Sequence, residues 1–269
     1  MDTKMFTFRW PINNFHLTWD GRGIILNSDD VMEGNKESWS FQESPDLFLA
    51  FAHLDSTNEQ EIVLFARKYG LLGTMYERLG DWQTEIEALR GAVNLWMELR
   101  KENWPMLASM VKWNKKDKRV TYSIGKGFGI WGAGILPVPF SRHNLSQDME
   151  KKDLEVMGWE VLRHLINIGL SDCNPQIEWD RGKLRLSFNP RNLLGALWLQ
   201  FALAVSGDWD FNHCEYCGRP FLLTPSINRT NRRYCKNSCK NMAYRQRVKG
   251  KGKVLFSPSS REKGRKKPT

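Results

Sequence analysis

Four of the five cysteines in this 269-residue chain lie close together, at Cys214, Cys217, Cys235 and Cys239. They form a C-x2-C pair and a C-x3-C pair that are separated by 17 residues. Two cysteine pairs with such short internal spacings are typical of zinc sites, and four thiolates complete a tetrahedral shell with no open position for a substrate. The spacing therefore predicts one structural Zn²⁺ and no zinc catalysis.

Two further residues bear on this chemistry. His213 directly precedes Cys214, and we interpret it as a neighbour of the site or as an alternate ligand. Cys173 stands apart from the cluster and is interpreted as an ordinary packed or near-surface thiol. The alternative to a metal site is four free cysteines in a small core. The low apolar content of the segment disfavours that alternative, because so small a unit needs a metal ion or a disulfide to stabilise its fold.

The elements around the cysteines must bring the two pairs together. Gly218 allows a tight turn after the first pair, and the second pair has the i, i+4 spacing of one face in the first turn of a helix. A turn of this kind, a short β-hairpin and a helix would form a treble-clef-like zinc finger. On the helix we expect an inward side of Cys239, Met242 and Ala243, and another side of Lys240, Tyr244 and Arg247.

Positive charge is concentrated around and after these cysteines. Residues 211–269 carry 16 Lys and Arg residues and two acidic residues, a net charge of +14. Residues 1–210 carry 24 Lys and Arg residues and 28 acidic residues, a net charge of −4. Cations neutralise phosphates and aromatic rings stack on bases, so this distribution favours a nucleic-acid partner, with DNA favoured over RNA. The expected contact residues are Arg219, Arg229, Arg232, Arg233, Lys236, Lys240, Tyr244, Arg245, Arg247 and Lys249.

Composition divides the chain into three parts. All twelve Trp residues lie before residue 211, so residues 1–210 form a Trp-rich body with enough apolar residues for a core. Residues 211–248 form the small zinc finger. Residues 249–269 are rich in Lys, Gly, Ser and Pro, which predicts a disordered basic tail.

A helix-rich α+β fold with β-hairpins is predicted for the body. Amphipathic spacing indicates helices over residues 82–100 and 154–168. Thr57 with Gln60 three residues later is typical of a capping box at the start of another helix. The segment 190–207, which Pro190 would open, is apolar on nearly every side, and we expect it to be buried at the centre of the body.

Strand signals complete the expected body. Alternating apolar and polar residues indicate strands at residues 6–10 and 120–124, and a short apolar run indicates another at 24–26. Two alternating runs joined by Asp180-Arg181-Gly182 predict a β-hairpin over residues 176–188.

Patterns for other chemistry are weak. The G-x-G-x-x-G match over residues 127–132 is followed by prolines instead of a helix, so it predicts a glycine-rich loop and no dinucleotide site. The sequence shows no nucleophile–base or paired-carboxylate pattern, which favours a binding protein over an enzyme. The start of the chain lacks the apolar core of a secretory signal, and the apolar run 193–205 is too short for a bilayer. We therefore expect a cytoplasmic protein with no membrane partner.

A cysteine pair, a Phe-Leu strand, a basic step, a last cysteine and an Arg-rich helix follow one another over residues 212–247. In this order the segment resembles the CGNR zinc-finger family, although Cys239-Lys240-Asn241-Met242 stands at its Cys-Gly-Asn-Arg motif. The resemblance implies an N-terminal ABATE-type domain and a role as a stress-responsive transcription regulator. The matching residues are Cys214, Cys217, Phe221-Leu222, Arg232-Arg233-Tyr234-Cys235, Cys239 and Tyr244-Arg245-Gln246-Arg247.

Three functions follow from these patterns. The favoured one is a DNA-binding transcription regulator whose body senses a small molecule or forms a homo-oligomer. The second is a nuclease or another nucleic-acid enzyme with its active site in the body. The third is an adaptor whose finger docks an acidic protein.

Overall fold

The computed structural model is a mixed helix and strand structure, as the sequence predicts. It describes residues 9–12, 17–19, 23–26, 37–40, 46–73, 76–114, 119–124, 133–137, 151–180, 182–223 and 232–248. The expected strand residues 6–8, the glycine-rich segment 127–132 and the tail 249–269 lie outside this part. The chain divides into two compact units, Met1–Asp208 and Trp209–Thr269.

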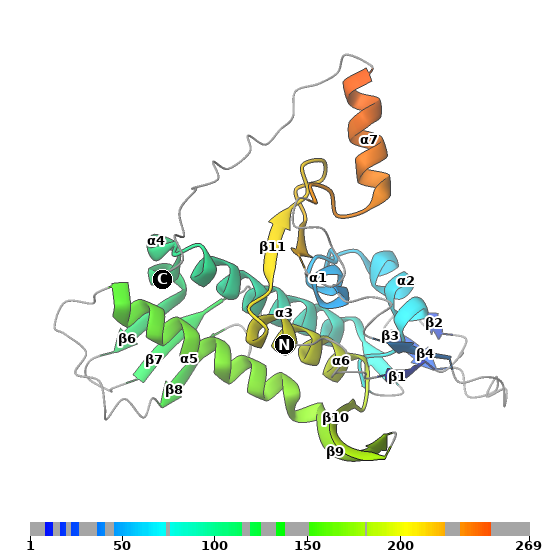
Figure 1. Cartoon of the computed structure of the whole chain (residues 1–269), viewed down its shortest axis with the longest axis horizontal. Helices are drawn as coiled ribbons and strands as arrows, with labels where there is room; N and C mark the ends of the chain where they lie inside the picture. The colour runs from blue at the N-terminus through cyan, green and yellow to red at the C-terminus, as the bar shows by residue number, and fades with distance from the viewer. Residues whose placement is uncertain are drawn as a thin grey trace. The chain divides into compact units, whose positions relative to one another are not determined.

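Helices form the interior of the first unit. α3 (Leu79–Arg100), α5 (Lys151–Gly169) and α6 (Leu193–Ser206) pack against one another, and α1 (Leu47–Ala52) packs against α3 and α6 (Figure 1). The amphipathic helices predicted over 82–100 and 154–168 are confirmed. The other helical elements in the described part of the first unit are α2 (Glu59–Tyr69), α4 (Trp104–Met110) and the 3-10 turn η3 (Leu170–Asp172).

Helix α6 lies at the centre of the core, as its all-round apolar sequence predicts. Trp198 and Phe201 are fully buried, and the ring of Phe201 lies 5.4 Å from that of Phe48 and 5.8 Å from that of Trp96. The buried Gln200 accepts a hydrogen bond from the backbone N–H of Phe48 at 3.1 Å, which satisfies its amide oxygen. Aromatic packing therefore joins α6 to both α1 and α3.

A buried carboxylate also stabilises this unit. Glu77 is only 2% exposed, and it accepts hydrogen bonds from the backbone N–H groups of Leu72 and Gly73 and from the indole N–H of Trp82. Three N–H donors replace the water that the carboxylate loses on burial. Nothing in the sequence pattern indicated this site.

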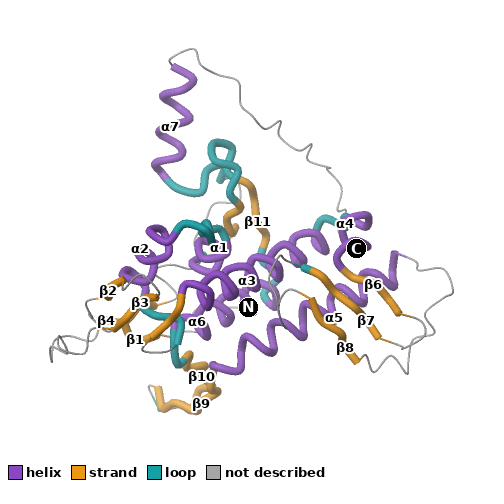
Figure 2. The backbone as a smooth tube through the Cα atoms, turned by 180° about the vertical axis from the view of Figure 1, so that it is seen from behind, coloured by secondary structure: helices purple, strands orange, loops and turns teal. Residues whose placement is uncertain are grey.

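Small antiparallel sheets flank the helices, and Figure 2 shows them in two groups on either side of the helical layer. One group contains the pair β1–β4 and the sheet β2–β3–β5, and the other is the sheet β6–β7–β8. Their bounds are β1 (Arg9–Ile12), β2 (Leu17–Trp19), β3 (Gly23–Leu26), β4 (Glu37–Ser40), β5 (Tyr76–Arg78), β6 (Val111–Asn114), β7 (Arg119–Ser123) and β8 (Ala133–Pro137).

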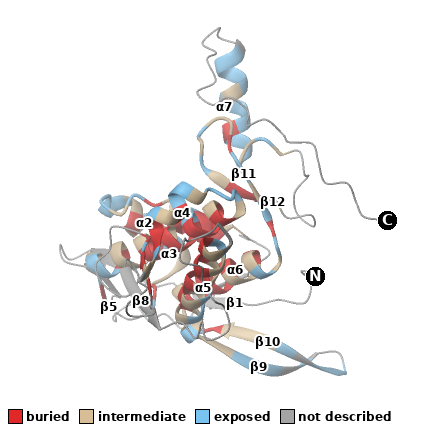
Figure 3. Cartoon of the chain, turned by 90° about the vertical axis from the view of Figure 1, so that its left-hand side faces the viewer, coloured by how far each residue is buried: buried red, intermediate tan, exposed pale blue. Residues whose placement is uncertain are grey.

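The predicted hairpin is confirmed and is longer than expected. β9 (Cys173–Asp180) pairs with β10 (Lys183–Pro190) over eight residues each, and Gly182 supplies a positive φ of 82° in the turn. The base of the hairpin packs against α6 and β1, whereas its far end is exposed (Figure 3). Pro190 ends β10 instead of opening α6, so the expected helix start was wrong.

Asparagine side chains cap two helices where the sequence indicated other residues. Asn58 accepts a hydrogen bond from the backbone N–H of Glu61 at the start of α2, and Asn192 does the same for Gly195 at the start of α6. The predicted capping box from Thr57 to Gln60 was wrong. The Thr57 hydroxyl is already engaged, because it donates to the carboxylate of Asp55 at 2.7 Å.

The second unit is small and contains a hairpin and one described helix. Its elements are β11 (Asp210–His213), β12 (Pro220–Leu223) and α7 (Asn237–Val248). Its buried residues include Phe221 and Leu222 together with two of the clustered cysteines. None of the described helices in either unit combines the length and the apolar character needed to cross a bilayer.

Candidate metal centre

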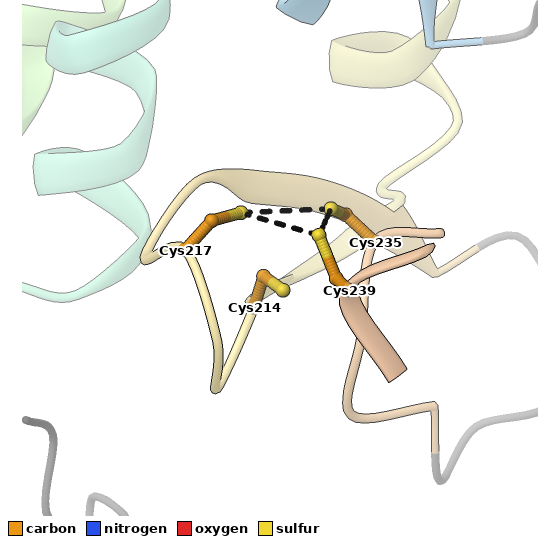
Figure 4. Close-up of side chains that lie close together, drawn as sticks. All are labelled: Cys214, Cys217, Cys235 and Cys239. Atoms are coloured by element: carbon orange, nitrogen blue, oxygen red, sulfur yellow. Dashed lines mark hydrogen bonds between the residues drawn. The ribbon is translucent and has the colours of Figure 1, made fainter. Parts of the chain in front are cut away.

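The first cysteine pair lies in the turn that joins β11 to β12. The backbone N–H of Cys214 donates to the carbonyl of Arg219 at 2.9 Å, and that of Gly218 donates to the carbonyl of Cys214 at 2.8 Å. Gly218 has a φ of 73°, which favours glycine, so its expected role in a tight turn is confirmed. The turn holds Cys214 and Cys217 on the same side of the hairpin end (Figure 4).

The second pair lies at the start of α7, with one correction to the prediction. Helix α7 begins at Asn237, so Cys239 lies in its first turn but Cys235 precedes the helix. The i, i+4 spacing is therefore not realised on one helical face. The sulfurs still meet, because the bend before α7 turns Cys235 toward Cys239 and their Sγ atoms lie 3.5 Å apart.

The four sulfurs form a compact cluster that can hold a metal ion. The Sγ atom of Cys217 lies 3.7 Å from that of Cys235 and 3.8 Å from that of Cys239, and all four Sγ atoms lie within 4.8 Å of one another (Figure 4). A zinc ion with Zn–S bonds of about 2.3 Å would space its four sulfurs by roughly 3.8 Å. The cluster therefore has the size of a tetrahedral thiolate shell, and all four cysteines are free of disulfides.

The environment of the thiols also suits a cation. Burial opposes ionisation of Cys214, but hydrogen bonds from the backbone N–H groups of Cys217, Cys235 and Tyr216 outweigh burial and lower the pKa of Cys214 to about 7. Burial and the neighbouring thiols raise the pKa values of Cys235 and Cys239. Four negative sulfurs at these distances repel one another, so a bound cation is what would allow all of them to ionise.

Arg232 supports the segment that carries Cys235. Its guanidinium donates to the carbonyl of Tyr234 at 2.8 Å and to that of Cys235, and it stacks over the ring of Phe221 at 5.0 Å. These contacts link β12 to the bend before α7. The sequence predicted Arg232 only as a phosphate contact and gave no sign of this supporting role, which depends on residues distant in the chain.

Arg233 forms an ion pair with Glu215, the acidic residue in the turn between β11 and β12. Its guanidinium donates to the carboxylate of Glu215, and this contact raises the pKa of Arg233. The backbone N–H of Glu215 also donates to the carbonyl of Arg233 at 3.0 Å. The contacts between Arg233 and Glu215 therefore join the segments that carry the two cysteine pairs, in addition to the contacts between the sulfurs.

The other predicted contact residues are exposed on the second unit. Lys240, Tyr244, Arg245 and Arg247 lie on α7, and the ring of Tyr244 is 64% exposed. Arg247 reaches the hydroxyl of Tyr234 at 3.4 Å. Arg219 and Lys236 are exposed next to the cysteines, whereas Arg229 and Lys249 lie outside the described residues.

Three further expectations for single side chains can be compared with the structure. Met242 is 41% exposed, so its predicted inward position was wrong; the small core is already filled by Phe221 and the two buried cysteines. His213 is exposed with its ring 5.9 Å from that of Phe211, and it does not join the sulfur cluster. Cys173 is half-buried in the first unit and donates to the carbonyl of Gly195, as expected for a packed thiol.

Comparison with known proteins adds no assignment. No protein-family model, no curated protein and no solved structure matches the chain. The resemblance of residues 212–247 to the CGNR zinc-finger family therefore stays a prediction.

Proposed function

We propose that the second unit is a treble-clef-like zinc finger that binds nucleic acid, with DNA favoured over RNA. The observation that carries the proposal is the convergence of four thiols within 4.8 Å at the base of a helix whose charged residues are all basic. Zinc suits this set best because it is the common metal for a closed shell of four cysteine thiolates. The metal would be structural, since no ligand position is left for a substrate.

Exposed cations next to the metal cluster support nucleic acid as the partner. Lys236, Lys240, Arg245 and Arg247 are exposed on or beside α7, and Tyr244 between them presents its ring to solvent. Basic groups on one helix neutralise successive phosphates, and a tyrosine ring stacks on bases. Arg232 and Arg233 already have partners inside the unit, so we assign the main phosphate contacts to the α7 residues.

For the whole chain we propose a transcription regulator in a reducing compartment such as the cytoplasm. The first unit would sense a small molecule or form a homo-oligomer, and the resemblance to the CGNR family implies that it is an ABATE-type domain. Free thiols throughout the chain agree with a reducing compartment.

The test measures how salt affects binding to duplex DNA and duplex RNA of the same sequence. Replacing Lys240 and Arg245 by Gln should weaken DNA binding about tenfold and lower the salt slope by about 2, because two phosphate contacts are lost. The matched control replaces Lys112 and Arg163 in the first unit by Gln. It removes the same charge from exposed sites and should leave the binding curve unchanged.

Three results would change the proposal. Equal losses in both double variants would show that general charge, and not α7, carries the binding. Tighter binding to RNA than to DNA would make RNA the preferred nucleic acid. No binding at low salt, together with nuclease-resistant capture of an acidic protein, would replace nucleic-acid binding by the adaptor function.

A further inference from the structure

The far end of the β9–β10 hairpin carries a group of large apolar side chains that are exposed in the part of the chain that the structure describes. Ile177 is 63% exposed, Trp179 72%, Leu184 69% and Leu186 52%. We call these four residues the ribbon patch. Large exposed apolar groups are ordinary when scattered, but a contiguous set marks an interaction site.

The strand register places the ribbon patch on one face. Trp179 lies directly opposite Leu184, and Ile177 directly opposite Leu186. Residues two apart in a strand point to the same side, so the two pairs are neighbours on that side. Toward the base of the hairpin the same face continues through the half-buried Phe188 and the buried Pro190. One apolar face thus runs out of the core into solvent.

The other face of the hairpin is polar. The amide of Asn189 donates to the side-chain oxygen of Gln176 at 3.0 Å, and the hydroxyl of Ser187 donates to the backbone carbonyl of Gln176. Farther out, the register pairs Arg185 with Glu178 and Lys183 with Asp180. This alternation is what a ribbon needs when one face meets water and the other is covered.

We propose that the ribbon patch is covered by the ribbon patch of a second copy of this chain. A dimer with two-fold symmetry uses the same surface on both copies, and a patch of bulky apolar side chains without charge can pack against a second copy of itself. A two-stranded ribbon is marginal on its own, and packing against a second ribbon would supply the missing layer. The proposal is independent of the metal and of nucleic acid.

The exposed area of the ribbon patch and the charges of the hairpin both agree with a second copy of the chain as the occupant. The patch exposes on the order of 500 Å² per copy, so a pair would bury about 1,000 Å², just below the range of standard interfaces and suited to a reversible dimer. The alternating positions hold Glu178 and Asp180 against Lys183 and Arg185, so the charges of two ribbons are balanced.

Sedimentation velocity of the full zinc-loaded chain tests this inference. The samples are treated with nuclease and kept at about 0.5 M NaCl, so that nucleic acid does not bridge the copies. Over a range of about 1 to 100 µM the chain should shift from monomer to dimer. Replacing Trp179 and Leu184 by Thr, which preserves strand propensity, should raise the dissociation constant at least about 20-fold.

The matched control replaces Glu178 and Arg185 by Thr. These residues are opposite each other in the same two strands and do not belong to the ribbon patch, so the dissociation constant should stay within about threefold of the original. Both variants should keep the near-UV signal of the buried Trp residues, because the patch is not part of the core.

Two results would overturn the inference: a chain that stays monomeric at the highest concentration, or a Trp179/Leu184 variant that dimerises as tightly as the original. In either case, binding to phosphatidylcholine–phosphatidylglycerol vesicles that is lost in the Trp179/Leu184 variant would assign the ribbon patch to a membrane surface instead.

Discussion

The two units of this chain reach a stable structure by different physical means. The first unit packs fully buried aromatic residues from separate helices, such as Phe48, Trp96 and Phe201, around α6. Among its described residues the second unit buries Trp209, Phe221, Leu222 and two cysteines. So few apolar side chains bury too little surface to stabilise a unit of this size on their own. Its interior is a cluster of sulfurs that repel one another when ionised.

This difference indicates that the two units depend on different conditions. The first unit should respond to changes in packing and to pH at buried carboxyls. The second should respond to the metal and hardly to the aromatic core of the first. Perturbing each unit separately is therefore the way to test the comparison.

The largest effect is expected from loss of the proposed metal ion. Replacing Cys217 by Ser removes one of the four proposed ligands, and structural zinc contributes about 10–16 kcal/mol to the folding of small zinc units. Hydrogen exchange over residues 209–248 should become fast, whereas exchange in α3 and α6 stays slow. A colorimetric zinc assay should find one ion per original chain and a loss in the variant.

The control for this prediction is Cys173→Ser. Cys173 lies in the first unit and is not part of the sulfur cluster, so zinc content should not change. Zinc loss in this control, or fast exchange in α6 after Cys217→Ser, would contradict the independence of the two units.

The second prediction perturbs the aromatic core of the first unit and leaves the cysteine cluster of the second unit unchanged. Phe201→Ala removes a ring that lies 5.4 Å from Phe48 and 6.0 Å from Trp198, and such a cavity lowers the free energy of unfolding by about 3–5 kcal/mol. Urea unfolding followed by Trp fluorescence should show the loss, while zinc content stays at one ion. Leu64→Ala, at a side chain that is 64% exposed, should change stability by less than about 0.5 kcal/mol.

Local sequence patterns predicted much of this architecture. The four clustered cysteines, the turn at Gly218, the buried helix α6 and the β9–β10 hairpin all depend on spacing within a short segment. Periodicity and turn residues are sufficient there because the partners are close in sequence.

The errors concern features that depend on partners distant in the sequence or on competition between neighbours. Thr57 is engaged by Asp55, so Asn58 caps α2 instead. The packing of Phe221 with two cysteines leaves no inward place for Met242. The supporting role of Arg232 requires carbonyls in the bend before α7 and a ring on β12, which no spacing rule indicates.

The third prediction concerns the pH dependence of the first unit. Burial, with smaller contributions from Asp172 and Asp81, raises the pKa of Glu85 from its ordinary value of 4.5 to about 7. Its Oε2 atom is buried with no hydrogen-bond partner among the described residues, in contrast to Glu77 with its three donors. Between those pH values the folded chain therefore holds a proton that the unfolded chain has released.

It follows that the free energy of unfolding should fall as the pH rises from about 4.5 through about 7, by up to about 3 kcal/mol from this group. Glu85→Gln keeps the shape and removes the titration, so urea unfolding at several pH values should show a flatter profile and a gain in stability above pH 7. An identical profile in the variant would exclude Glu85 as the source.

The smallest effect separates two adjacent arginines of the second unit. Arg232→Gln removes charge-assisted hydrogen bonds to the carbonyls of Tyr234 and Cys235, and it should cost about 1–2 kcal/mol. Competition with a chelator should then show zinc affinity lowered about tenfold. Arg233→Gln removes only an exposed pair with Glu215, which contributes less than about 1 kcal/mol, so zinc affinity should fall much less. If both variants held zinc as tightly as the original chain, Arg232 would be free to serve as a phosphate contact, as the sequence alone predicted.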